Sequence, residues 1–121
     1  RHKVMWPNMP IEFIVLPEDK NGHHFGLFIE NELVSIVSLF QTDDGVVQFR
    51  KFATKSEEQG KGYGSKLLSH LIDFAKEQSY HTLWCNARVD KTDFYKKFGM
   101  FETKGTYVKQ NIKFVILKKV L

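Results

Sequence analysis

Cysteine is the scarcest informative residue of this chain, and its scarcity excludes two kinds of architecture. A single cysteine, Cys85, stands among 121 residues, so an internal disulfide and a cysteine-built metal site are both excluded. Cys85 lies in the apolar stretch "HTLWCNA", which predicts a buried small hydrophobe rather than a reactive thiol. We therefore expect no metal centre. Without a disulfide framework, the expected compartment is the cytoplasm.

Long hydrophobic runs are also missing. No apolar run reaches the ~18 residues that a membrane-spanning helix requires, so we expect no membrane partner. The sequence shows no pattern of a signal peptide. Because the chain begins with Arg1 rather than Met, the natural N-terminus is expected to be trimmed.

Charge of one sign is present in only mild excess. The formal net charge is +4, with a sequence pI of about 9.2. A basic nucleic-acid-binding domain is one hypothesis, but the chain lacks a clustered Lys/Arg stripe with interleaved aromatic residues. We therefore expect no nucleic-acid partner. The composition, 42% hydrophobic and 26% charged, is typical of one globular domain spanning 1–121. Eleven phenylalanines predict an aromatic-rich core or an apolar channel.

Alternating apolar residues and turn residues predict seven strands and two main helices. The strands are expected at 11–16, 25–30, 33–40, 46–54, 82–87, 101–108 and 111–120. A first helix follows the glycines at 60–64, with apolar residues at helical spacing from Leu67 to Ala75. A second, shorter helix is expected at 90–99, with Asp90 as N-cap and Gly99 as stop. A further short helix is expected before Pro7.

The order of these elements predicts a mixed sheet. A strand, a helix and a further strand in succession normally form parallel neighbours. The hairpins expected on both sides of this unit require antiparallel pairing. The fold class is therefore α/β or α+β.

The stretch "EEQGKGYGSKLLSHLIDFA" has three glycines, Gly60, Gly62 and Gly64, directly before an apolar-periodic helix. A helix N-terminus leaves its first amides without internal partners and carries about half a positive charge. These features together predict an anion site, most naturally for phosphate, with Lys61 and Lys66 adding charge. A tight turn without a ligand is the structural alternative.

Two familiar phosphate-binding patterns do not fit this loop. The Walker pattern requires a glycine five residues after Gly60, where Ser65 stands. The dinucleotide-binding fingerprint requires a small residue three positions after Gly62, where Ser65 is a poor fit. A third pattern fits. Residues 59–64, "QGKGYG", match Gln/Arg-x-x-Gly-x-Gly/Ala, and "FYKKFGMFET" at 94–103 matches a Phe-Tyr-x-x-x-Gly-Phe segment, with Met100 in place of the last Phe. In these motifs the chain resembles the GNAT superfamily of N-acetyltransferases. Residues 1–8, "RHKVMWPN", also resemble the start of a small bacterial GNAT subgroup.

The resemblance implies a single domain with a central splayed mixed β-sheet flanked by helices, whose first family strand is missing or truncated here. It implies binding of acetyl-coenzyme A as cosubstrate. The pyrophosphate would lie on the main-chain amides of Gly60, Lys61, Gly62, Tyr63, Gly64 and Ser65, with Gln59 at the loop entry. The pantetheine arm would pair with Phe52, Ala53 and Thr54 as an added strand. Asn86 is a weaker candidate for a pantetheine contact.

The resemblance also implies the reaction, which is direct attack of a neutral amine on the thioester. An N–H on the strand at 52–54 would stabilise the oxyanion. Tyr95 matches the family position of a general acid, and Lys96 or Arg88 would lower the energy of its proton transfer. Core packing with an incidental hydroxyl is the alternative for Tyr95. No general base is evident: the candidates are histidines, which are His23, His24, His70 and His81, or a water chain.

The chain departs from the family pattern at Arg88 and Lys91, where many members have Asn and Ala. This difference predicts a positive side chain near the cofactor phosphates or at the cleft mouth.

The expected acceptor is an unidentified amine of a small molecule or peptide. It would lie beside an apolar wall that includes Phe28, Phe40 and Phe114. The sequence does not decide the oligomeric state, for which a homodimer through the terminal hairpin is one hypothesis. A non-catalytic acyl-coenzyme A sensor on the same fold is the alternative to an enzyme.

Overall fold

The computed structural model describes residues 11–19 and 22–121, with side chains described from residue 22 onwards. Its elements, in chain order, are β1 (Ile11–Asp19), β2 (Gly22–Ile29), β3 (Glu32–Asp43), β4 (Val46–Thr54), η1 (Ser56–Glu58), α1 (Tyr63–Glu77), β5 (Thr82–Arg88), η2 (Val89–Lys91), α2 (Thr92–Lys96), β6 (Phe101–Lys109) and β7 (Ile112–Val120). The short helix expected before Pro7 lies outside the described residues.

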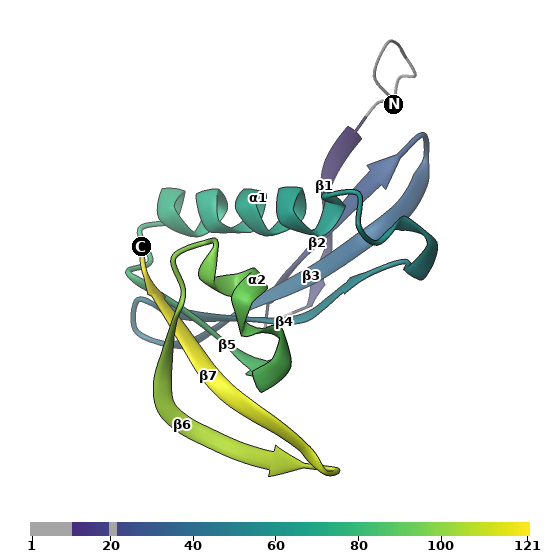
Figure 1. The fold of residues 1–121 in the computed structure, drawn as a ribbon. Coiled ribbons are helices and arrows are strands. Elements are labelled where there is room, and N and C mark those ends of the chain that lie inside the picture. Colours follow the sequence, from purple (N-terminus) through teal and green to yellow (C-terminus); the bar gives the residue numbers. More distant parts are fainter. Residues whose placement is uncertain (1–10, 20–21) are drawn as a thin grey trace.

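The strands form one sheet in the order β1-β2-β3-β4-β5-β7-β6 (Figure 1). Only β4 and β5, which α1 connects, are parallel neighbours, and the other pairs are antiparallel. The predicted mixed sheet is therefore confirmed. Its single parallel pairing joins the beginnings of β4 and β5, and the glycine loop leaves β4 at the other end of that strand.

Two hairpins have left-handed residues at their turns. Glu30 and Asn31 connect β2 to β3 with φ of 50° and 74°, and Gln110 and Asn111 connect β6 to β7 with φ of 53° and 67°. Two consecutive positive φ angles match the right-handed twist of the flanking strands. Both hairpins expected from the sequence are present.

The core lies between the sheet and α1. The helix buries Leu67, Leu68, Leu71, Ile72 and Ala75, the residues that its periodicity predicts. They pack against buried residues of β2 to β5 and β7, such as Leu27, Leu39 and Leu83. Each buried leucine side chain contributes about 1.5–3 kcal/mol by leaving water. This packing fixes where the N-terminus of α1 meets the sheet.

The second helix is shorter than predicted, and its expected cap is wrong. A 3₁₀ turn, η2, occupies Val89–Lys91, and Lys91 is the N-cap of α2 without a side-chain capping bond. The Asp90 carboxylate accepts a hydrogen bond from Arg88 at 3.2 Å instead. Gly99 stops the helical turn as expected, with φ of 86°.

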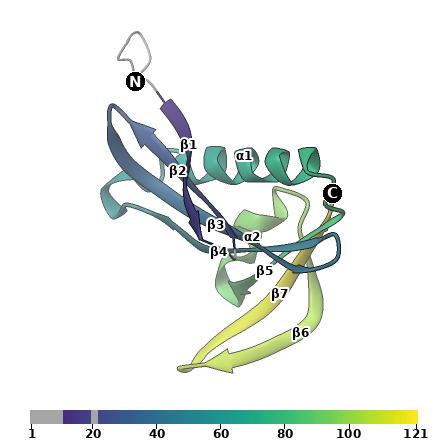
Figure 2. The same cartoon turned by 180° about the vertical axis from the view of Figure 1, so that it is seen from behind.

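Both helices cover the same face of the sheet (Figures 1 and 2). On the opposite face, no helix of the described residues covers the strands (Figure 2). Neither helix has the length and apolar character that crossing a bilayer would require, within the part of the chain that the structure describes.

Candidate active site

Strands β4 and β5 pair only at their beginnings. Val46, Val47 and Gln48 pair with Thr82, Leu83 and Trp84, after which β4 continues to Thr54 beside β3 and β5 continues to Arg88 beside β7. A bulge lies just beyond the paired segment, where Lys51 has φ of 58° and the β3–β4 register shifts. Bulges bend a strand and increase its twist. The edge of β4 that faces β5 therefore has no strand partner past Gln48 among the described residues.

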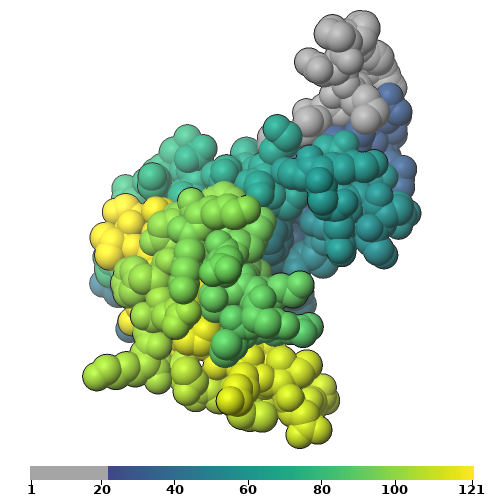
Figure 3. All heavy atoms as spheres, in the orientation of Figure 1, coloured from purple at the N-terminus to yellow at the C-terminus, as the bar shows by residue number. Residues whose placement is uncertain are grey.

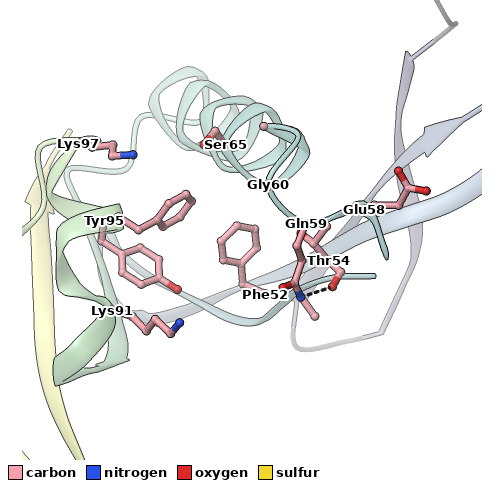
Figure 4. Close-up of a pocket in the computed structure, with 13 residues that line it drawn as sticks. Phe52, Thr54, Glu58, Gln59, Gly60, Ser65, Lys91, Tyr95 and Lys97 are labelled. Carbon is pink, nitrogen blue, oxygen red and sulfur yellow. Dashed lines mark hydrogen bonds between the residues drawn. The ribbon is translucent and has the colours of Figure 1, made fainter. Parts of the chain in front are cut away.

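A pocket of about 660 Å³ lies on the helix side of this divergence. Its walls come from the end of β4, the glycine loop, the first turn of α1, and α2 with its flanking residues (Figures 3 and 4). The lining residues are Phe52, Ala53, Thr54, Glu58, Gln59, Gly60, Gly62, Gly64, Ser65, Lys91, Phe94, Tyr95 and Lys97. Motifs some forty residues apart in the sequence thus line one cavity.

The three positions of the loop require glycine for two different structural reasons. Gly60 and Gly62 have φ of 83° and 85°, a left-handed backbone that side chains disfavour, and an added Cβ would meet nothing within 4 Å. At Gly64, an added Cβ would lie 3.2 Å from both the Phe52 ring and Thr54 Oγ1. The first two glycines shape a loop whose outer side is open, and the third lets α1 approach β4.

The amides of this loop are available for a ligand. Among the described residues, no backbone carbonyl accepts a hydrogen bond from the amides of 60–65, and the first such bond of the helix joins Lys66 N to Gly62 O at 3.1 Å. No acidic residue lies in the first turn of α1, and its N-cap, Gly62, has no side chain. The positive end of a 15-residue helix is therefore not neutralised by a carboxylate of its own first turn. An anion fits this arrangement.

Side chains hold the end of β4 in place under the loop. Gln59 donates from Nε2 to the Thr54 carbonyl at 3.0 Å, as Figure 4 shows. Ser35 of β3, 2% exposed, donates to the Ala53 carbonyl at 3.0 Å and lies 3.0 Å from Thr54 Oγ1. These bonds fix the strand segment that the sequence assigned to pantetheine. Sequence reasoning missed Ser35, because a serine within a strand carries no pattern of its own.

Tyr95 lies among aromatic rings, and its hydroxyl points into the pocket (Figure 4). Its ring centroid is 5.1 Å from that of Phe94, 5.8 Å from Phe49 and 6.4 Å from Phe52. Burial, with a smaller contribution from Cys85, raises the pKa of Tyr95 to about 12. The phenol is therefore neutral at ordinary pH and is an available donor.

The cations expected to assist Tyr95 do not lower its pKa. Lys96 pairs with Glu102 at 3.0 Å, and Arg88 pairs with Asp90 at 3.2 Å. Desolvation is the dominant influence on the phenol, and it acts in the opposite direction. The sequence could not show this, because the burial of one hydroxyl depends on how α2 packs against β4.

Three predicted cofactor residues do not line the pocket. The exposed Lys61 pairs with Glu58 at 3.0 Å, Tyr63 packs against the core, and Asn86 is exposed on β5. Lys91, flagged as a departure from the family pattern, does line the pocket, whereas Arg88 does not. Glu58, Phe94 and Lys97 are lining residues that the sequence did not single out.

The candidate histidines lie outside the pocket lining. The His23 ring packs on Phe74 at 5.2 Å, and the His70 ring packs on Phe25 at 6.0 Å. His24 Nδ1 lies 2.7 Å from Ser38 Oγ, and His81 Nδ1 lies 2.9 Å from Thr82 Oγ1. A general base is therefore not assigned by geometry.

Comparison with known proteins identifies the class to which this fold and site belong. The family model described as "Acetyltransferase (GNAT) family" matches residues 4–100, so the chain belongs to that family. It is an acyltransferase by family, and acetyl-coenzyme A is the cosubstrate of GNAT enzymes. These findings confirm the family, fold class and cosubstrate expected from the motifs.

Individual relatives agree with this placement. YitI of Bacillus subtilis (strain 168), an uncharacterized N-acetyltransferase, is 29% identical over 110 residues, covering 84% of this chain and 74% of that protein. A GNAT family acetyltransferase from Elizabethkingia anophelis, solved with acetyl-CoA bound, has a TM-score of 0.77 at 16% identity, covering 96% and 100% of the two chains. A Bacillus subtilis acetyltransferase solved in complex with CoA has a TM-score of 0.76 at 18% identity, covering 94% and 99%.

Proposed function

We propose that this protein is an N-acetyltransferase that transfers the acetyl group of acetyl-coenzyme A to a primary amine. The observation that carries the proposal is the single pocket that joins the open glycine loop, the unpaired edge of β4 and the buried hydroxyl of Tyr95. The acetyl-CoA and CoA in the two structural neighbours support the choice of cosubstrate.

The cosubstrate would lie along two backbone surfaces. The pyrophosphate would accept hydrogen bonds from the amides of 60–65, where open space above Gly60 and Gly62 leaves room for it. The pantetheine arm would add to the edge of β4 at 52–54, because an unpaired strand edge recognises an extended chain through main-chain groups. Lys91 and Lys97 line the same pocket and would face the phosphates. A contact from Asn86 stays a prediction.

The reaction balances without a covalent enzyme intermediate. The amine nitrogen forms a bond to the thioester carbonyl carbon, the carbon–sulfur bond breaks, the amine loses a proton, and coenzyme A leaves as a thiol. A main-chain N–H on β4 at 52–54 would donate to the oxyanion. Tyr95, kept protonated by its high pKa, would donate to the departing sulfur. A thiol has an ordinary pKa of ~8.5, so the Tyr95 phenol is much the weaker acid. The hydrogen bond from Tyr95 to the departing sulfur would therefore contribute more to the stabilisation of that sulfur than complete transfer of the proton.

Two measurements test this function. Isothermal titration calorimetry should detect coenzyme A binding, and release of free thiol from acetyl-coenzyme A should depend on added amine. Coenzyme A binding that is undetectable at millimolar concentration would contradict the proposal, since KM values of enzymes rarely exceed about 1 mM.

A non-catalytic acyl-coenzyme A sensor is the second candidate, and the high pKa of Tyr95 is the observation that favours it. The sensor would bind acetyl-coenzyme A without turnover across a broad amine panel. Tyr95→Phe would then change neither binding nor any rate, whereas an enzyme would lose rate.

A further inference from the structure

The sheet face opposite the helices is chemically unlike the helix side. Side chains on paired strands share a face, and the register pairs Phe40 with Gln48, Gln48 with Trp84, and Trp84 with Lys118. Leu83 and Cys85, which alternate with these residues on β5, are buried on the helix side. We call the sheet face that no helix of the described residues covers (Figure 2) the open face. We define it by Phe40, Arg50, Trp84, Arg88, Phe114 and Lys118.

The open face carries three cations near the divergence of β4 and β5. Arg50 is exposed, and its guanidinium carbon lies 5.6 Å from the centre of the Phe40 ring. Arg88 lies at the end of β5 with a side chain 49% exposed, and the exposed Lys118 lies opposite Trp84 on β7. Among the described residues, only Arg88 of these three pairs with a carboxylate, that of Asp90. Arg50 and Lys118 thus have positive charge available for a ligand.

Aromatic rings alternate with these cations. The Trp84 indole donates from Nε1 to Thr42 Oγ1 at 3.0 Å, which fixes the orientation of the ring. Phe114 lies opposite Arg88 in the register and stacks on Tyr107 at 5.2 Å. The rings offer flat apolar contacts beside each cation.

Carboxylates are missing from the open-face positions of β4, β5 and β7, whose side chains are described; the nearest carboxylates are those of Asp43, which pairs in register with Val46, and Asp90, which bonds to Arg88. Besides the residues that define the face, its positions on β4, β5 and β7 hold only uncharged residues, which are Val46, Gln48, Thr82, Asn86, Ile112, Ile116 and Val120. Glu102, the nearest acid of the terminal hairpin, pairs in register with Leu117 and bonds to Lys96 on the helix side. A polyamine would therefore find no described carboxylate at the open-face positions of these three strands, whereas an anion would find two available cations.

We propose that the open face binds the acceptor, and that the acceptor is a small primary amine that also carries a carboxylate and an apolar or aromatic group. This inference rests on the proposed function. If the cosubstrate enters the divergence from the helix side, the amine reaches the thioester from the opposite side. There Arg50 and Lys118 hold the carboxylate, and Trp84, Phe40 and Phe114 pack against the apolar group.

The test is a panel of matched amines assayed with acetyl-coenzyme A. Phenylalanine is compared with phenethylamine, tryptophan with tryptamine, and each amino acid with its amide, with spermidine as a polycation. We expect kcat/KM for the carboxylate-bearing members to exceed that of their neutral partners by at least about ten-fold, which corresponds to about 1.4 kcal/mol.

Variants locate the effect. Arg50→Gln should raise KM for the carboxylate-bearing amines by about ten-fold, leave the neutral amines unchanged and leave the affinity for coenzyme A unchanged. Lys76→Gln removes one exposed charge from α1 on the other side of the sheet and should change none of these values. An Arg50→Lys variant should recover part of the lost affinity, because it restores the charge.

The outcomes separate the two proposals. Failure to bind coenzyme A overturns the proposed function together with this inference. Binding of coenzyme A with equal or better turnover of the neutral amines or spermidine, or with no turnover of any panel member, overturns this inference alone. Saturable binding of a single-stranded oligonucleotide at physiological salt that Arg50→Gln abolishes also overturns it, because the face would then serve a nucleic acid.

Discussion

The two faces of the sheet offer different kinds of groups to a ligand. On the helix side, the candidate cosubstrate pocket is built largely from main chain, namely left-handed glycines, free amides and an unpaired strand edge. On the open face, the candidate acceptor site is built from side chains, namely guanidinium groups, an ammonium group and aromatic rings. On these two proposals, main-chain groups would hold the cosubstrate and a few surface side chains would set the preference for the acceptor.

Replacing Tyr95 separates chemistry from binding on the helix side, and it is expected to have the largest effect. Tyr95→Phe keeps the ring among Phe49, Phe52 and Phe94 but removes the donor to the sulfur. We expect kcat to fall by about 100-fold or more, as when one hydrogen-bond donor to a developing negative charge is removed, with coenzyme A affinity unchanged. Steady-state kinetics and calorimetry measure the two quantities. Tyr80→Phe, at the far end of α1, is the control, and an equal loss there would contradict the assignment.

Replacing a loop glycine tests whether main chain dominates the helix-side pocket. Gly62→Ala forces a side chain into a left-handed backbone, which costs about 1–2 kcal/mol, and puts a methyl group into the open space above the loop. We expect coenzyme A affinity to fall by about ten-fold or more in calorimetry.

The matched control is Gly99→Ala, where φ is 86° and the added Cβ would meet only the flexible end of Lys119. Both variants should lower the melting temperature to a similar extent, but only Gly62→Ala should weaken coenzyme A binding. Similar weakening by both would show that the loop acts through stability rather than through contact.

Two serines on β3 sharpen the contrast between the faces. Ser35→Ala removes the bonds to Ala53 and Thr54, each worth about 1 kcal/mol, and should weaken coenzyme A binding a few-fold. Ser38 bonds to His24 instead, so Ser38→Ala should leave this binding unchanged. Calorimetry on both variants decides, and a larger loss from Ser38→Ala would reverse the assignment of the faces.

The pH dependence of stability probes the burial of the helix side and is the smallest effect near neutrality. Burial raises the pKa of the Cys85 thiol from 9.0 to about 12 and that of Tyr95 from 10.0 to about 12. Both groups are neutral when protonated, so above about pH 9 the unfolded chain releases protons first and the free energy of unfolding falls. Denaturant titrations from neutral to alkaline pH should show this fall, and Cys85→Ala should reduce it. A flat profile in the unmodified protein would contradict the burial.

Local features of the fold could be predicted from the sequence. The periodicity of Leu67 to Ala75 gives the buried face of α1, and the loop glycines mark where it begins. The Asp90 cap was wrong, because its carboxylate has a competing partner in Arg88 that spacing alone does not reveal.

Features that depend on packing between distant segments were not predictable. Asn86, the weaker candidate for a pantetheine contact, is exposed on β5, where side chains alternate and the neighbouring Cys85 is buried on the helix side. The raised pKa of Tyr95 depends on how α2 lies against β4, and Lys97 reaches the pocket for the same reason. The placement of the cofactor residues in the complex remains a prediction.

Amide chemical-shift mapping with two related ligands tests the main-chain account most directly. Coenzyme A should shift the backbone amides of both 60–65 and 52–54, whereas pantetheine, which lacks the pyrophosphate, should shift only those of 52–54. Saturable coenzyme A binding that leaves the amides of 60–65 unshifted would contradict the claim that this loop holds the diphosphate.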